Sequence, residues 1–410
     1  MTSKLFFKST LLFFSLLIVS CGSSKKAIPQ LKPSADNVTL TSTSTDVTFK
    51  TGAENFESYL QLLKDKRVGI VTNQTGILSK EKHLVDFLIE QNINLQKIYA
   101  PEHGFRGTAD AGELIVDGKD TKTNLPIISL YGNNKKPKPE QLEGIDILVF
   151  DLQDVGARFY TYISSLHYVM EACAENNIPL LVLDRPNPNG TIIDGPILEK
   201  EHTSFVGMHE IPVLHGMTIG EYAKMINGEK WLKDSLQCDL KVAPCLNYSH
   251  EMKYSLPVKP SPNLPNDQSI NLYASLCFFE GTNVSVGRGT EKQFQIYGSP
   301  FLPESECDFS FTPQPNFGAK DPVHNGKLCF GEDLTEIRKV YRLELKWLLK
   351  AYENTTDKTV FFNDFFTKLA GTKKLREQIE AGMTEKEIRK TWQEGLERFN
   401  KVRAKYLIYF

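Results

Sequence analysis

Short apolar runs alternate with helical segments over the first half of the chain, and this alternation is the strongest constraint on its fold. Helical spacing of apolar residues is clearest over 80–91 and 165–176. The apolar runs between such segments, which we expect to be strands, cover 67–71, 97–100, 127–130, 145–150 and 179–183. Alternating strands and helices predict an α/β fold, in which a mostly parallel sheet carries helices on both faces.

Polar side chains close four of these expected strands. They are Asn73, Glu102, Asp151 and Asp184. The carboxyl ends of parallel strands lie at one edge of a sheet, where ligands bind, so we expect the four to converge in space. Polar residues are common at strand ends because loops follow them. Three carboxylates with aromatic and arginine neighbours nevertheless favour a site.

The N-terminus has the pattern of a targeting segment. Lys4 and Lys8 precede a short apolar run at 11–19, and Ile-Val-Ser-Cys then ends at Cys21. This pattern predicts a lipoprotein signal peptide at 1–20 and lipidation of Cys21, although an ordinary signal peptide with an incidental cysteine is the alternative. We therefore expect a lipid-anchored protein of a bacterial cell envelope, facing the periplasm or the surface.

The remaining chain is expected to form two domains. Residues 21–52 are polar and predict a flexible tether. We assign 53–240, which begins with a helix expected at 53–63, to the α/β domain. We assign 241–410 to a smaller α+β C-terminal domain, with helices expected at 334–351 and 385–406.

One helix is expected at 217–227, near the end of the first domain. Thr218 stands at its N-cap and Glu221 three positions later, which is the spacing of a capping box. Glu221 is therefore interpreted as a cap and not as a catalyst.

Composition excludes several classes of function. The 410 residues carry a net charge of −2 and no basic run, which argues against a nucleic-acid partner. No C-x-x-C, H-E-x-x-H, G-x-G-x-x-G after a strand, or G-x-S-x-G occurs, so we expect no metal, no nucleotide cofactor and no serine-hydrolase elbow. Outside the cytoplasm, Cys238 with Cys245, or Cys307 with Cys329, could form disulfides.

Glu102 is the best candidate for acid–base chemistry. It lies in the motif PEHGFRG directly after an expected strand, with Phe105 close by. An apolar neighbour can desolvate a glutamate so that it stays protonated, as a general acid requires. His103 could orient it, and a salt bridge between Glu102 and Arg106 is the structural alternative.

A second group of chemically active residues lies in DLQDVGARFYTY, after the strand at 145–150. Asp151 or Asp154 could serve as a second carboxylate, and Arg158 could bind a substrate carboxylate in a bidentate manner. Tyr160 and Tyr162 suit stacking on a sugar ring. The alternative is that Asp154 caps the following helix and pairs with Arg158.

A third group lies in FEGTNVSVGRGT, at 279–290. It offers Glu280, Asn283 and Arg288 on a glycine-rich loop, which does not match a phosphate-binding motif. His215 stands in a loop just ahead of a helix, where it could face a cleft or be a structural histidine.

Taken together, the motifs resemble those of the exo-β-N-acetylmuramidase family, the NamZ-type glycoside hydrolases. The resemblance covers roughly residues 60–300, and the helical C-terminus is also similar. The matching segments are VTNQTG, PEHGFRG, SLYG, DLQDVGARFYTY, LDRPNPNG, DGP, SFVG, HGMTIGE, PSPNLP and FEGTNVSVGRGT.

This resemblance implies a Rossmann-like domain and a smaller C-terminal domain with the active site between them. It implies release of N-acetylmuramic acid from the non-reducing end of peptidoglycan fragments, with Glu102 as the catalytic acid and no cofactor. The partner of Glu102 stays open among Asp151, Asp154, Glu280 and the substrate itself, as does the choice of an inverting, retaining or substrate-assisted mechanism.

The substrate expected from the resemblance also assigns binding roles. The lactyl carboxylate of muramic acid needs a cation, and the acetamido group needs donors and acceptors. A lipoprotein that binds muropeptides without cleaving them, and an esterase or amidase, are the alternatives. The residues expected to bind substrate are Asn73, His103, Arg106, Tyr131, Arg158, Tyr160, Tyr162, Asp184, His215, Asn283 and Arg288.

Overall fold

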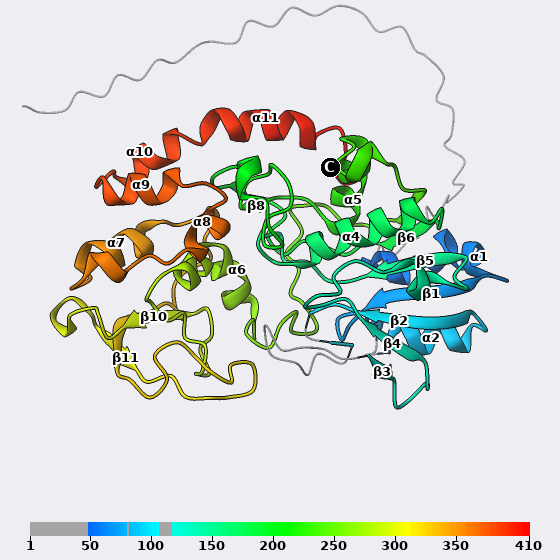
Figure 1. The fold of residues 1–410 in the computed structure, drawn as a ribbon, viewed down its shortest axis with the longest axis horizontal. Coiled ribbons are helices and arrows are strands. Elements are labelled where there is room, and N and C mark those ends of the chain that lie inside the picture. Colours follow the sequence, from blue (N-terminus) through cyan, green and yellow to red (C-terminus); the bar gives the residue numbers. More distant parts are fainter. Residues whose placement is uncertain (1–47, 80–81, 103, 106–116) are drawn as a thin grey trace, which may run out of the picture. The chain divides into compact units, whose positions relative to one another are not determined.

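The computed structural model describes residues 48–79, 82–102, 104–105 and 117–410, and the first half of the chain forms most of a seven-stranded sheet (right in Figure 1). Its strands lie in the order β3-β4-β2-β1-β5-β6-β9. All neighbours are parallel except β3 and β4, which confirms the predicted mostly parallel sheet. The strands are β1 (Arg67–Thr72), β2 (Asn94–Ala100), β3 (Gly118–Lys119), β4 (Pro126–Ser129), β5 (Ile147–Asp151), β6 (Leu180–Leu183) and β9 (Leu240–Ala243).

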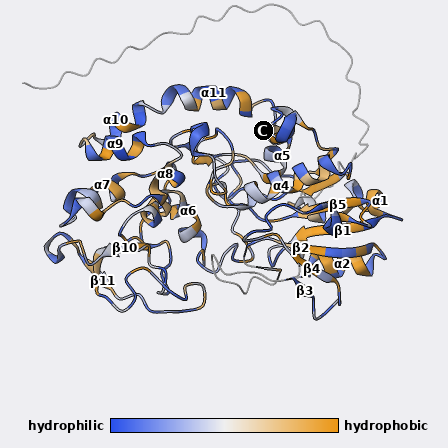
Figure 2. Cartoon of the chain, in the orientation of Figure 1, coloured by the Kyte–Doolittle hydropathy of each residue, from blue (hydrophilic) through white to orange (hydrophobic). Residues whose placement is uncertain are grey.

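Apolar cores cover both faces of this sheet. Along β5, Leu148 and Phe150 join one core, whereas Ile147 and Val149 join the other. Every residue of β5 is buried, which is typical of a parallel strand covered on both sides. The strands are largely orange in Figure 2 for this reason. The helices of this part are α1 (Leu60–Leu63), α2 (Leu84–Glu90), α3 (Pro139–Leu142), α4 (Tyr162–Glu175) and α5 (Ile219–Gly228).

The second part of the chain is α+β, as predicted. Strand β12 pairs antiparallel with β10 and β11 in a three-stranded sheet. The assignment of 53–240 and 241–410 to separate domains stays a prediction, and β9 of the first sheet extends to Ala243. The elements are α6 (Asp267–Leu276), β10 (Ile296–Ser299), β11 (Phe309–Phe311), β12 (Cys329–Asp333), α7 (Lys346–Asn354), α8 (Phe365–Ala370), α9 (Lys374–Glu380), α10 (Glu385–Lys390) and α11 (Gln393–Arg403).

The capping prediction for α5 is confirmed. Thr218 is the N-cap, its hydroxyl accepts a bond from the Glu221 N–H, and the Glu221 carboxylate accepts one from the Thr218 N–H at 3.0 Å. A small two-stranded sheet, formed by β7 (Ile193–Asp194) and β8 (Leu214–His215), lies ahead of this helix.

The predicted helix at 385–406 is divided into α10 and α11, and two other predicted helices are shorter than expected. At 53–63 only α1 is α-helical, because the preceding residues form two 3₁₀ turns broken at Asn55. At 334–351 the helix begins only at Lys346. Here the N–H groups of Val340 and Leu343 bond to the side chains of Asn271 and Asp194, which removes them from helical bonding.

Neither of the two possible disulfides is formed, because all six cysteines of the described residues carry free thiols. Cys238 and Cys245 flank β9 at its opposite ends, and an extended strand of that length separates them by roughly 20 Å. Cys329 pairs with Phe311 across β11 and β12, so Cys307 lies several positions away. None of the described helices is long and apolar enough to cross a membrane.

Candidate active site

A pocket of about 460 Å³ lies at the carboxyl edge of the large sheet, where the C-terminal part of the chain covers it. This volume falls in the range of small-molecule sites. Buried apolar and aromatic side chains form much of its wall. Its ionisable and hydroxyl-bearing lining residues are Glu102, Tyr131, Tyr160, Thr161, Tyr162, Ser261, Tyr273, Glu280, Ser285, Arg288 and Asp321.

Glu102 is held in this pocket by two hydroxyl groups. Strand β2 ends at Ala100, and Glu102 follows it by two residues. The Tyr131 hydroxyl donates to Oε1 at 2.9 Å, and the Thr161 hydroxyl donates to Oε2 at 2.8 Å. Tyr131 comes from the loop after the neighbouring strand β4, and Thr161 precedes α4. The side chain is therefore fixed from both sides while it remains half-buried.

Asn73 and Tyr162 form the support behind Glu102. The Asn73 amide donates to the Tyr162 hydroxyl at 2.6 Å, and that hydroxyl lies 3.4 Å from the Glu102 carbonyl oxygen. Asn73 is fully buried and also accepts two bonds from Thr75. Burial raises the pKa of Tyr162, which keeps its hydroxyl protonated. Asn73, which we expected to bind substrate, instead supports the loop under the pocket.

Glu280 and Arg288 form a second charged group in the same pocket. Arg288 Nη1 lies 3.3 Å from Glu280 Oε1, and Arg288 Nη2 donates to the Gly318 carbonyl. Glu280 belongs to the 3₁₀ segment η6 (Cys277–Gly281). The loop that carries Arg288 needs glycine at position 289, where φ is +81° and a side chain would meet Pro322.

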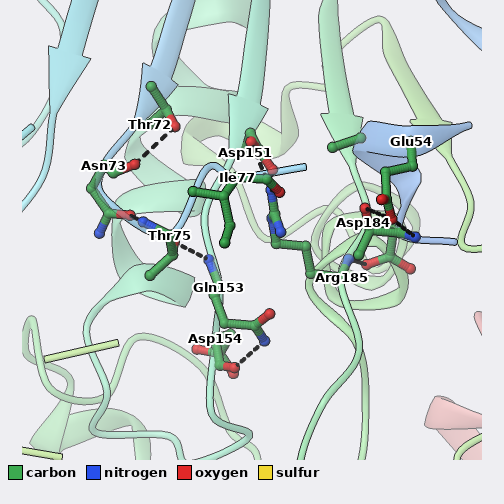
Figure 3. A network of polar contacts seen from close by, with 12 residues as sticks. Glu54, Thr72, Asn73, Thr75, Ile77, Asp151, Gln153, Asp154, Asp184 and Arg185 are labelled. Atoms are coloured by element: carbon green, nitrogen blue, oxygen red, sulfur yellow. Dashed lines mark hydrogen bonds and ion pairs between the residues drawn. The ribbon is translucent and has the colours of Figure 1, made fainter. Parts of the chain in front are cut away.

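Asp151 forms a buried ion pair with Arg185, whose side chain points toward it in Figure 3. Arg185 Nε lies 2.6 Å from Oδ1, and Nη2 lies 3.0 Å from Oδ2.

In nucleotide-binding α/β proteins the ligand lies where the strand order reverses, which is between β1 and β5 here. A side chain at Gly76 would come within 3.0 Å of Asp151 Oδ2, so protein fills this crevice. Asp151 therefore stabilises the sheet edge and does not line the pocket.

Asp154 and His215 are also structural. Asp154 Oδ2 accepts from the Gly156 N–H at 2.6 Å and lies 3.7 Å from His215 Nε2. Both side chains are buried. Asp154 does not cap the helix that follows it, because the N-cap of α4 is Thr161.

Arg158 is fully buried and binds backbone carbonyls. Its guanidinium donates to Pro196 and Ile211 on one side and to Leu369 and Ala370 on the other. Desolvation lowers its pKa to about 9. Arg158 thus joins two distant segments of the chain and is not available to a substrate carboxylate.

Asp184 is a buried anchor for the C-terminus. Its oxygens accept from the Thr218 hydroxyl at 2.7 Å, the Gly220 N–H at 2.7 Å and the Tyr409 hydroxyl at 2.6 Å. Desolvation raises its pKa to about 6, against the effect of these donors. The sheet topology does place Asp184 at the predicted edge, but protein groups cover its carboxylate.

Of the residues predicted to form the site, six line the pocket. Asn283 lies next to the pocket wall, with both side-chain amide atoms buried. His103, Arg106 and Cys21 lie outside the described residues. The six lining residues are Glu102, Tyr131, Tyr160, Tyr162, Glu280 and Arg288.

Sequence reasoning missed Asp321, Ser261 and Asn263, which also line the pocket. Asp321 precedes a proline in a segment without periodicity, so no pattern marks it. Ser261 and Asn263 lie in the proline-rich motif PSPNLP, whose stiff, extended backbone was the available signal.

One group of acidic and histidine side chains in the described part of the chain has ligand spacing for a metal: Glu199, Glu201 and His202. Glu199 already bonds to Lys374 and to Thr372 at 2.8 Å. None of the three residues lines the pocket, and we assign them no metal.

The pocket at the edge of the parallel sheet thus holds a glutamate oriented by two hydroxyls and a second carboxylate, and most glycoside hydrolases use a pair of carboxylates. Comparison with known protein families shows which family the chain belongs to. The family models for the N- and C-terminal parts of the exo-β-N-acetylmuramidase NamZ match residues 68–268 and 271–409. The chain belongs to this family.

Relatives agree with this assignment over most of the chain. The peptidoglycan β-N-acetylmuramidase NamZ of Bacillus subtilis is 42% identical over 373 residues, which cover 86% of this chain and 89% of that protein. Two solved structures of DUF1343 family proteins from Bacteroides fragilis are similar. One has a TM-score of 0.81 and 45% identity, covering 88% of this chain and 99% of that one. The other has a TM-score of 0.77 and 30% identity, covering 89% and 100%.

Proposed function

We propose that this protein is an exo-acting glycoside hydrolase that releases N-acetylmuramic acid from the non-reducing end of peptidoglycan fragments, in cell-wall turnover or recycling. Membership of the muramidase family supports the reaction class and the polymer. The observation that carries the proposal is the Glu102 carboxyl group, held by Tyr131 and Thr161 in a pocket of suitable size.

Glu102 acts as the proton donor in this proposal. Its proton passes to the glycosidic oxygen as the bond from that oxygen to C1 of the muramic acid breaks. The oxygen of a water molecule then forms the new bond to C1, and the water proton passes to a base. After these steps Glu102 is a carboxylate, and it takes up a new proton from solvent.

Glu280 is the proposed second carboxylate. Two of the carboxylates considered from the sequence, Asp151 and Asp154, do not line the pocket. Glu280 lines the pocket together with Glu102. Among the described residues that line the pocket, the arginine is Arg288, which lies beside Glu280. Its guanidinium suits the lactyl carboxylate of the substrate.

A chromogenic β-N-acetylmuraminide tests this function. The wild type should release the chromophore, and Glu102→Gln should lower kcat by roughly 10²–10⁴-fold while substrate binding persists. Glu394→Gln, at an exposed carboxylate of α11, is the matched control and should retain full activity. An inactive wild type that still binds muropeptides would instead indicate a binding lipoprotein. A Glu102→Gln variant as fast as wild type would refute the assigned acid.

The lipid anchor is a second proposal. The lipobox at Cys21 supports it, and the predicted tether at 21–52 would separate the folded part from the membrane, except for its last residues, since Lys50 and Gly52 bond to Leu246 and Asp184. Cys21→Ala should move the protein from the membrane fraction to the soluble fraction. Metabolic labelling with a fatty-acid analogue provides an independent measurement, and a membrane-bound, unlabelled Cys21→Ala variant would contradict the proposal.

A further inference from the structure

Two apolar side chains stand exposed at the rim of the pocket that contains Glu102. Val323 is 50% exposed and Phe365 is 36% exposed, and both line this pocket. Isolated apolar side chains are common on protein surfaces and need no explanation. Apolar side chains gathered at one pocket, in contrast, mark a place where a ligand excludes water.

Phe365 is presented on a rigid support. It begins α8, where its N–H donates to Asn363 Oδ1 at 2.9 Å, while the next residue, Phe366, is fully buried. Helix α8 lies so close to the segment carrying Glu280 that a side chain at Gly281 would come within 2.4 Å of the Phe366 Cα. The backbone that carries Phe365 is therefore held close to the segment that carries Glu280.

Val323 is held by contacts on both sides of it. Pro322 packs against the glycine-rich loop, where a side chain at Gly289 would come within 2.7 Å of the proline ring. His324 Nε2 lies 2.7 Å from the Asn283 carbonyl oxygen. Val323 is thus carried by a loop that is anchored on both sides of it.

The residues that line the pocket differ in exposure. Tyr160, Tyr162 and Phe294 are buried, whereas Val323 and Phe365 are exposed and form part of the rim. An enzyme that removes the terminal sugar places that sugar at the closed end and lets the remaining chain leave through the mouth. The rim then contacts the leaving group.

We infer that Phe365 and Val323 form a binding subsite for the leaving-group sugar, whose apolar C–H face packs on the aromatic ring. The inference rests on the proposed function, because it takes the direction of the substrate from exo cleavage at the non-reducing end. The Phe365 ring and the Val323 side chain offer an apolar surface without hydrogen-bond donors. They therefore favour a pyranose leaving group over a small alkyl group.

Two substrates separate this subsite from the catalytic pocket: a disaccharide with N-acetylmuramic acid β-linked to N-acetylglucosamine, and methyl β-N-acetylmuraminide. The quantity measured is kcat/KM for the disaccharide divided by kcat/KM for the methyl glycoside. Phe365→Ala should lower this ratio about tenfold, because stacking and burial are lost only with the larger leaving group. Val323→Ala should lower it less, and Phe365→Trp should preserve it.

Tyr341→Ala is the matched control, since Tyr341 is 68% exposed and lies outside the pocket lining. It should leave both substrates and their ratio unchanged. A ratio unaffected by both Phe365→Ala and Val323→Ala would overturn the subsite. A wild type inactive on both substrates would instead refute the proposed function, so the two failures are distinguishable.

Discussion

Arg185 contacts both carboxylate oxygens of Asp151, at 2.6 and 3.0 Å, and the two side chains are almost completely buried. Breaking a buried pair leaves one charge uncompensated, so Asp151→Ala should lower the free energy of unfolding by about 3–5 kcal/mol. Denaturant unfolding measures this loss. The double variant Asp151→Leu with Arg185→Met should recover much of it, because no buried charge remains.

A surface pair provides the control for that experiment. Arg67 and Asp146 make a similarly close contact, with more than half of the Arg67 side chain exposed. Asp146→Asn should therefore cost far less than Asp151→Ala. Equal losses at the two sites would show that burial of the Asp151 pair has no energetic consequence.

The Thr161 hydroxyl should be a positioning group for Glu102. It donates to Glu102 Oε2 at 2.8 Å, and a hydrogen bond between neutral groups contributes about 0.5–1.5 kcal/mol, since the proton donor Glu102 is uncharged before the reaction. Thr161→Val should therefore reduce kcat by roughly two- to tenfold, with KM changed little. Thr161→Ser restores the hydroxyl and should restore kcat. If valine is as active as serine, the bond has no part in positioning Glu102.

A pair of buried histidines should make the protein less stable in acid. His209 Nε2 lies 3.0 Å from His167 Nδ1, and His209 Nδ1 lies 2.8 Å from the Tyr222 hydroxyl. Desolvation lowers the pKa of both histidines, and that of His209 falls well below its ordinary value of 6.5. The stability contributed by a lowered pKa is complete above the unfolded-state value. It is lost as the pH falls toward the folded-state value.

The measurement is the free energy of unfolding of the wild type and of His209→Gln between pH 7.5 and 5. On acidification the wild type should lose up to about 1.4 kcal/mol per pH unit more than the variant. The Glu171 carboxylate lies 3.6 Å from His167, so it limits the loss of stability that protonation of His167 would cause. A difference between the two proteins that is constant with pH would contradict the assignment to His209.

The C-terminal Tyr409 should stabilise the sheet edge through Asp184. Its hydroxyl donates to Asp184 Oδ2 at 2.6 Å and accepts from the Cys245 N–H at 2.8 Å. Tyr409→Phe removes one donor from a buried carboxylate and should cost about 1.5–3 kcal/mol in unfolding free energy. Tyr406→Phe, which loses a bond to Glu229 at the surface, is the control. A loss at Tyr409 no larger than at Tyr406 would argue against the anchor.

Much of the framework could be predicted from local sequence pattern. Apolar runs of strand length, separated by helical spacing, specify parallel strands, and parallel strands place their carboxyl ends at one edge. Glu102 could therefore be assigned to that edge from PEHGFRG and the strand before it. The Thr218–Glu221 box was predictable for a similar reason, because both partners lie within one turn of one helix.

The sequence by itself determined the order of the strands' polar ends and the residue types offered at the edge. Only the tertiary structure decided which charges face the pocket and which hold the fold together. Asp151, Arg158 and Asp184 resembled site residues because their chemistry suits a site. Their partners, however, lie 34, up to 212 and up to 225 residues away in the chain. A carboxylate or guanidinium binds substrate only if no protein group has already compensated its buried charge, and compensation over such distances leaves no local pattern to read.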